Sequence, residues 1–90
     1  EKARLHLIMA KYHFNAGNTS AALNRLDNAE LALNNLLKTD RYRLRWQKLT
    51  QIKNSVANLR AELAEGRSFT EADENRIDSW ISYLNEWSRV

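Results

Sequence analysis

The sequence has no cysteine, no proline and only two glycines among its 90 residues. Without cysteine the chain can form neither disulfide bonds nor a thiolate zinc site, and two histidines do not favour a structural metal core. Sheets and loop-rich folds depend on glycine and proline for their turns, whereas long helices do not. These absences predict an all-helical chain.

Long apolar runs are also missing. No segment approaches the roughly 18 to 20 apolar residues that span a bilayer, and none resembles a signal peptide. The length predicts a single helical domain over residues 1–90, with little room for a deep substrate cavity. Because the chain begins with Glu1 rather than Met, we expect a domain taken from a longer protein, whose anchor could lie elsewhere in that protein.

Apolar residues recur at spacings of three and four, the period of an amphipathic helix. The pattern predicts helices over about 2–16, 19–37, 40–65 and 70–88. Gly17 and Gly66 are expected to end helices, and Ser68 or Thr70, each followed three residues later by an acid, fits a capping box. Short loops favour antiparallel neighbours, so the predicted fold class is all-α. It is either a four-helix up-down-up-down bundle or an array of helical hairpins.

The first predicted helix has two apolar faces. One face carries Leu7, Ala10 and Phe14. The other carries a second stripe, formed by Leu5, Ile8, Met9, Tyr12 and Ala16. We therefore expect this helix to be buried on two sides.

Small residues in the first hairpin are spaced as in a tetratricopeptide repeat. They are Ala10, Gly17, Ala22 and Ala29, with the bulky Leu26 among them. The hairpin resembles one such unit over about 34 residues, with His6 and Asn34 where the repeat usually has Trp and Pro. A single unit cannot bury its own face, so the resemblance implies divergent neighbours.

A second resemblance covers about residues 3–87. Its sequence features are Arg4-Leu5, then Ala21-Ala22-Leu23 followed by Leu26 and Ala29, then Leu59-Arg60-Ala61. In these features the chain resembles the extracytoplasmic helical region of HemX-like bacterial inner-membrane proteins. The resemblance implies a membrane-anchored, non-enzymatic protein that works through partners, in the periplasm or on the cytoplasmic face of the inner membrane.

Residues that carry chemistry are sparse. His6 and His13 lie two helical turns apart, too far to chelate one ion by themselves, and we interpret them as packing residues. The carboxylates from Glu62 to Asp78 fall at a helix end, a loop and a first helical turn, where acids favour the macrodipole and are expected to stay solvated. The sequence contains no glycine-rich phosphate loop and no nucleophile elbow. We expect no enzymatic activity, no cofactor and no bound metal.

The charges are unevenly distributed along the chain. The formal net charge of +3 divides into +1 for residues 1–37, +6 for residues 38–60 and −4 for residues 61–90. Cations cluster where the third helix starts, although the helix dipole disfavours them there by a few tenths of a kcal/mol each. Because local stability does not explain this placement, we predict a contact surface formed by Arg41, Tyr42, Arg43, Arg45, Trp46 and Lys48.

Several partners fit this basic surface. A protein with an acidic surface, including the acidic end of another copy, is the first choice. Nucleic acid is the second, with Trp46 or Tyr42 stacking on bases, and an anionic membrane surface is a further candidate. A solvated cationic face without a partner is the alternative. The sequence therefore predicts a protein-interaction or scaffold module, with nucleic-acid binding as the alternative function.

Overall fold

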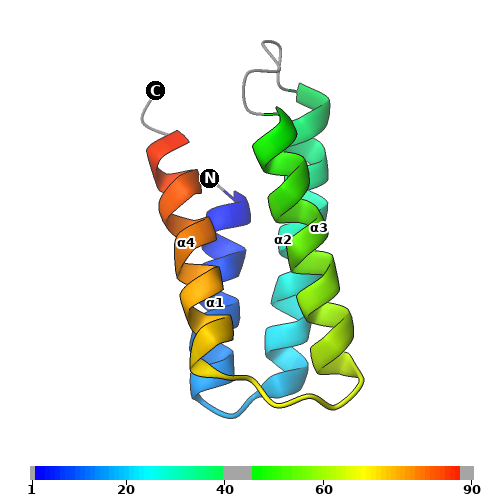
Figure 1. Cartoon of the computed structure of the whole chain (residues 1–90), viewed down its shortest axis with the longest axis vertical. Coiled ribbons are helices and arrows are strands. Elements are labelled where there is room, and N and C mark those ends of the chain that lie inside the picture. Colours follow the sequence, from blue (N-terminus) through cyan, green and yellow to red (C-terminus); the bar gives the residue numbers. More distant parts are fainter. Residues whose placement is uncertain (1, 40–45, 88–90) are drawn as a thin grey trace.

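The structure is a computed structural model, and it describes residues 2–39 and 46–87. The chain is all-α, and the helices form an antiparallel bundle in which α1 packs against α2 and α4, and α2 packs against α3 (Figure 1). The four helices are α1 (Lys2–Asn15), α2 (Thr19–Thr39), α3 (Trp46–Ala64) and α4 (Glu71–Trp87). The prediction of an all-α fold with four helices is confirmed.

The observed helix ends lie close to the predicted ones. Helix α1 ends one residue before its predicted end, α4 begins one residue after its predicted start, and α2 continues two residues beyond 37. The predicted end of α4 at residue 88 lies outside the described residues. Helix α3 ends at Ala64, and its predicted start at residue 40 lies outside the described residues.

Both glycines end helices, as the sequence predicts. Gly17 has a φ of 83° and Gly66 a φ of 112°, a left-handed conformation that glycine adopts without a Cβ clash. After α1, the Asn18 N–H donates to the carbonyl of His13 at 2.8 Å and the Gly17 N–H to that of Phe14 at 3.2 Å. The same pair of hydrogen bonds follows α3. Each helix therefore ends in a Schellman motif, which satisfies carbonyls that have no partner within the helix.

Helix α4 begins with a capping box. The Asp73 N–H donates to the Thr70 hydroxyl at 3.3 Å, and the Thr70 N–H donates to the Asp73 carboxylate at 3.0 Å. Of the two capping boxes predicted from the sequence, the structure contains the one that begins at Thr70. It satisfies two N–H groups at the start of the helix.

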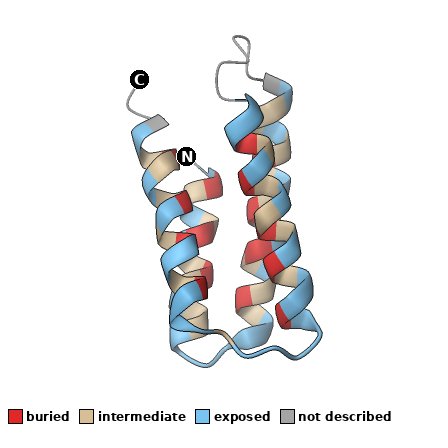
Figure 2. Ribbon diagram, in the orientation of Figure 1, coloured by how far each residue is buried: buried red, intermediate tan, exposed pale blue. Residues whose placement is uncertain are grey.

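Both α1 and α2, which pack against each other, carry fully buried alanines. Ala3 and Ala10 on α1, and Ala22 and Ala29 on α2, are all fully buried. Each pair is seven residues apart, so both members lie on one face of their helix, and small side chains let two helices approach closely. Buried positions cluster on the inward sides of the helices (Figure 2). The larger members of the core are Leu7, Leu26, Leu33, Leu49, Ile52, Val56, Leu59, Leu63, Ile77, Trp80 and Leu84.

The expectation that the first helix is buried on two sides is wrong. Leu5, Ile8 and Tyr12 are 55%, 40% and 65% exposed, whereas Leu7 and Ala10 on the opposite face are fully buried. The cause is the position of α1 in the bundle, because its two neighbours, α2 and α4, cover only one side of it.

The expectation that the acids around the start of α4 stay solvated is wrong for Asp73. This residue is 3% exposed. Its carboxylate accepts hydrogen bonds from the capping box and from Arg67, which compensate for the loss of water.

Candidate interaction surface

Cations from three helices gather at one end of the bundle, which we call the basic end. It is formed by Lys2 and Arg4 at the start of α1, Lys38 at the end of α2 and Lys48 at the start of α3. The antiparallel arrangement places these helix ends toward the same end of the bundle (Figure 1). Four of the predicted contact residues, Arg41, Tyr42, Arg43 and Arg45, lie outside the described residues, so the structure places only Trp46 and Lys48.

Trp46 is a large aromatic residue at this end of the bundle, and it is exposed to solvent. Trp46 is 49% exposed, whereas Trp80 on α4 is 7% exposed and belongs to the core. A shallow hollow of about 450 Å³ runs from Trp46 along the outer side of α3. Its other lining residues are Gln47, Thr50, Gln51 and Asn54. The surface therefore combines an indole with uncharged hydrogen-bonding groups.

Lys48 lies beside the aromatic ring of Tyr83 on α4. Its Nζ is 5.7 Å from the ring centroid, within the range of a cation–π contact. Lys48 is exposed, and no carboxylate among the described residues forms an ion pair with it. Its charge is therefore available to a partner.

Most of the acids lie at the opposite end of the bundle, which we call the acidic end. It is formed by Glu62, Glu65, Glu71, Asp73, Glu74 and Asp78. Here Arg67, in the loop between α3 and α4, donates to both oxygens of Asp73 at 2.9 and 3.0 Å and to Glu62 at 3.3 Å. This two-pronged geometry is the strong form of an arginine–carboxylate pair.

Burial and hydrogen bonding act on the pKa of Asp73 in opposite directions. Burial opposes ionisation of the carboxyl, but hydrogen bonds from Arg67 and from the N–H and hydroxyl of Thr70 outweigh it. The pKa of Asp73 is therefore held below its ordinary value, and the carboxylate is ionised at neutral pH.

A second cation, Lys11, also pairs with a carboxylate at the acidic end. Lys11 on α1 lies 2.7 Å from Asp78 on α4, and the hydrogen bond to Asp78 raises the pKa of Lys11. The sequence analysis missed the pairing of Arg67 and Lys11 with these acids. No spacing rule could have found either pair, because one partner lies in a loop or on another helix.

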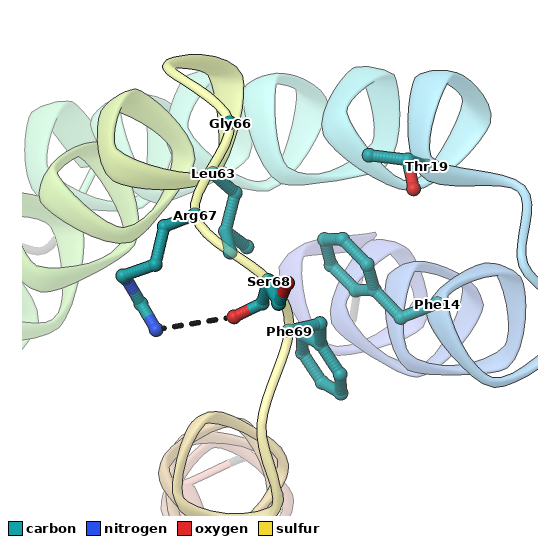
Figure 3. Close-up of a pocket in the computed structure, with 7 residues that line it drawn as sticks. All are labelled: Phe14, Thr19, Leu63, Gly66, Arg67, Ser68 and Phe69. Carbon is teal, nitrogen blue, oxygen red and sulfur yellow. Dashed lines mark hydrogen bonds between the residues drawn. The ribbon is translucent and has the colours of Figure 1, made fainter.

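A small hollow of about 290 Å³ lies at the acidic end, and Figure 3 shows its lining. The rings of Phe14 and Phe69 stack there with centroids 4.2 Å apart and an interplanar angle of 8°. The Arg67 guanidinium donates to the Ser68 carbonyl oxygen at 3.3 Å as well as to the acids. The charge of Arg67 is already paired with Asp73 and Glu62. The stacked rings of Phe14 and Phe69 therefore attach the loop between α3 and α4 to α1.

The two histidines are not brought together. Arg25 Nη1 lies 3.2 Å from His6 Nδ1, and since arginine only donates, His6 accepts at this nitrogen. Burial, together with the charges of Arg25 and Lys2, lowers the pKa of His6. Over residues 2–39 and 46–87, no three His, Asp or Glu side chains are grouped so that they could hold a metal ion.

Within the described part of the chain, no helix has both the length and the hydropathy needed to cross a membrane. Comparisons with protein-family models, with curated proteins and with solved structures find no match to this chain.

Proposed function

We propose that this chain is a non-enzymatic protein-interaction module that contacts an acidic protein surface through its basic end. The observation that carries the proposal is the exposure of Trp46. Its indole is 49% exposed, although the residues that continue the same stripe along α3 are buried. An exposed indole leaves a large apolar surface in water, and tryptophan is enriched among the residues that carry binding energy at protein interfaces.

The charges around Trp46 support an acidic partner. Lys2, Lys38 and Lys48 are exposed, and no acid among the described residues forms an ion pair with them. Arg43 and Arg45 lie close to Trp46 in the sequence and add to the local positive charge. Charge complementarity of this kind speeds association and selects against basic partners.

Nucleic acid is the second candidate. An aromatic ring beside cations can stack on a base while the cations contact phosphates. Protein is favoured because the net charge of the whole chain is only +3 and the acidic end would repel a long polyanion.

The test places a photo-reactive amino acid at position 46 and, as a control, at position 71 at the acidic end. We expect acidic proteins from the source cells to cross-link to position 46 and not to position 71. Reversing Arg41, Arg43 and Arg45 to Glu should weaken binding of the identified partner by about tenfold, equivalent to about 1.4 kcal/mol. Lys53→Glu, a single reversal farther along α3, should have little effect.

Two results would count against the proposal. Cross-linking of the same proteins from positions 46 and 71 would show that the contact is not specific. Tight binding of oligonucleotides that falls steeply between about 50 and 200 mM salt, with no protein captured, would favour nucleic acid instead.

A further inference from the structure

The outer face of α1 is apolar, which is unusual for the solvent side of a helix. Leu5, Ile8 and Tyr12 follow one another at spacings of three and four, so they form one stripe. They are 55%, 40% and 65% exposed. Helices at the surface of a bundle normally place polar residues on this side. We call this stripe the α1 outer face.

Three polar side chains of α1 are directed to its neighbours instead. Arg4 donates to Asn85 on α4 at 3.1 Å, and Lys11 pairs with Asp78 on the same helix at 2.7 Å. On the other flank, His6 contacts Arg25 on α2. Arg4, Lys11 and His6 therefore lie along its contacts with α4 and α2, whereas the stripe of apolar side chains on the α1 outer face points outward.

The order of side chains along the stripe suits a twofold axis. Ile8 lies near the middle, with Leu5 three residues before it and Tyr12 four residues after it. When two such helices pack antiparallel, Leu5 of one copy meets Tyr12 of the other, and Ile8 lies beside Ile8. A twofold interface requires this kind of self-complementary surface.

The charges of the bundle favour the same arrangement. An antiparallel pair places the basic end of one copy beside the acidic end of the other. Lys2 at the start of α1 then lies toward the end of the partner where Glu71 opens the first turn of α4. A parallel pair would place like charges together at both ends.

We propose that the α1 outer face binds a second copy of this chain, packed antiparallel about a twofold axis near Ile8. Its apolar contact lies on α1 and not at Trp46, whereas the charge of the basic end contributes to both proposed contacts. The apolar stripe contains only three large side chains per copy, so the dimer should be weak, with a dissociation constant of about 10 µM to 1 mM.

Sedimentation measurements between about 5 µM and 1 mM protein test whether the dimer forms. We expect the mass to rise from monomer to dimer, and Ile8→Lys to keep the chain monomeric while its helical circular dichroism is unchanged. Leu31→Lys is the matched control, because Leu31 is 56% exposed on α2, outside the α1 outer face. It should leave the dimer intact. A monomer at every concentration, or a dimer unaffected by Ile8→Lys, would overturn the proposal.

Single-cysteine variants test the orientation, since the natural chain has no cysteine. In the antiparallel pair the two copies of residue 8 lie side by side, whereas the two copies of residue 5 are about 10 Å apart along the helix axis. Ile8→Cys should therefore form a disulfide-linked dimer at least about tenfold faster than Leu5→Cys. Gln51→Cys on α3 reports random collision. Equal rates for positions 5 and 8, both above that control, would indicate a parallel pair and reject the proposed arrangement.

Discussion

The charged side chains at the two ends of the bundle differ in whether they form ion pairs within the chain. At the acidic end, Arg67 holds Asp73 and Glu62, and Lys11 holds Asp78, so cations of the chain itself pair with much of the negative charge. At the basic end, Lys48 contacts an aromatic ring, and no ion pair of Lys48 with an acid occurs among the described residues. Charge at the acidic end therefore stabilises the fold, whereas charge at the basic end is available for binding.

The largest effect on stability is expected from Asp73→Ala. The change leaves the Thr70 N–H without its acceptor and removes the two-pronged pair with Arg67, whose guanidinium keeps only Glu62 and the Ser68 carbonyl oxygen. We expect the free energy of unfolding, measured with urea, to fall by about 1 to 3 kcal/mol. The control is Glu71→Ala in the same helical turn, because Glu71 is exposed and should change stability by less than about 0.5 kcal/mol. Equal effects of the two substitutions would show that the acidic end is not specially stabilised.

Lowering the pH should reduce the contribution of Asp73 to the free energy of unfolding over a defined pH range. The pKa of Asp73 is lower in the folded chain than in the unfolded chain, so its contribution is complete above the unfolded value, about 3.9. The contribution is lost as the pH falls from there through the folded value, because the unfolded state then binds more protons. Urea titrations between about pH 6 and 2.5 should show this loss in the natural chain and a smaller loss in Asp73→Asn. Identical pH profiles would contradict the assignment to Asp73.

The smallest expected effect on stability comes from the protonation of His6, which lies toward the basic end. Burial and the charges of Arg25 and Lys2 lower its pKa in the folded chain, so the unfolded chain binds a proton more readily. Stability should therefore fall as the pH drops from above the unfolded value, about 6.5, through the lowered folded value. Solvent screening limits the effect to less than about 1 kcal/mol. In His6→Gln the unfolding midpoint should depend less on pH between about pH 7.5 and 5. A natural chain that becomes more stable as the pH falls over this range would contradict the mechanism.

Local features of the fold could be predicted because each depends on a few neighbouring residues. Gly17 and Gly66 end helices because their φ angles are positive, and Thr70 pairs with Asp73 because a capping box spans only three residues. Along α3 the apolar residues from Leu49 to Leu63 recur at spacings of three and four, and they form the buried face of this helix.

The candidate sites were less accessible to sequence reasoning. The same periodicity that correctly predicted α1 as a helix wrongly predicted burial for Ile8, because periodicity does not reveal how many neighbours a helix has. Trp46 continues the apolar stripe of α3, yet it lies at the end of the bundle and is half-exposed. The predicted contact residues Arg41, Tyr42, Arg43 and Arg45 stay a prediction.

By itself, the sequence determined that this chain forms four amphipathic helices with short connections, since the absence of proline and the apolar periodicity act within each segment. It also determined that positive and negative charge are separated along the chain. Only the tertiary structure decided that Asp73 is buried and paired, and that the α1 outer face is left uncovered. The physical reason is that burial and ion pairing depend on which helices become neighbours, and those contacts join residues far apart in the sequence.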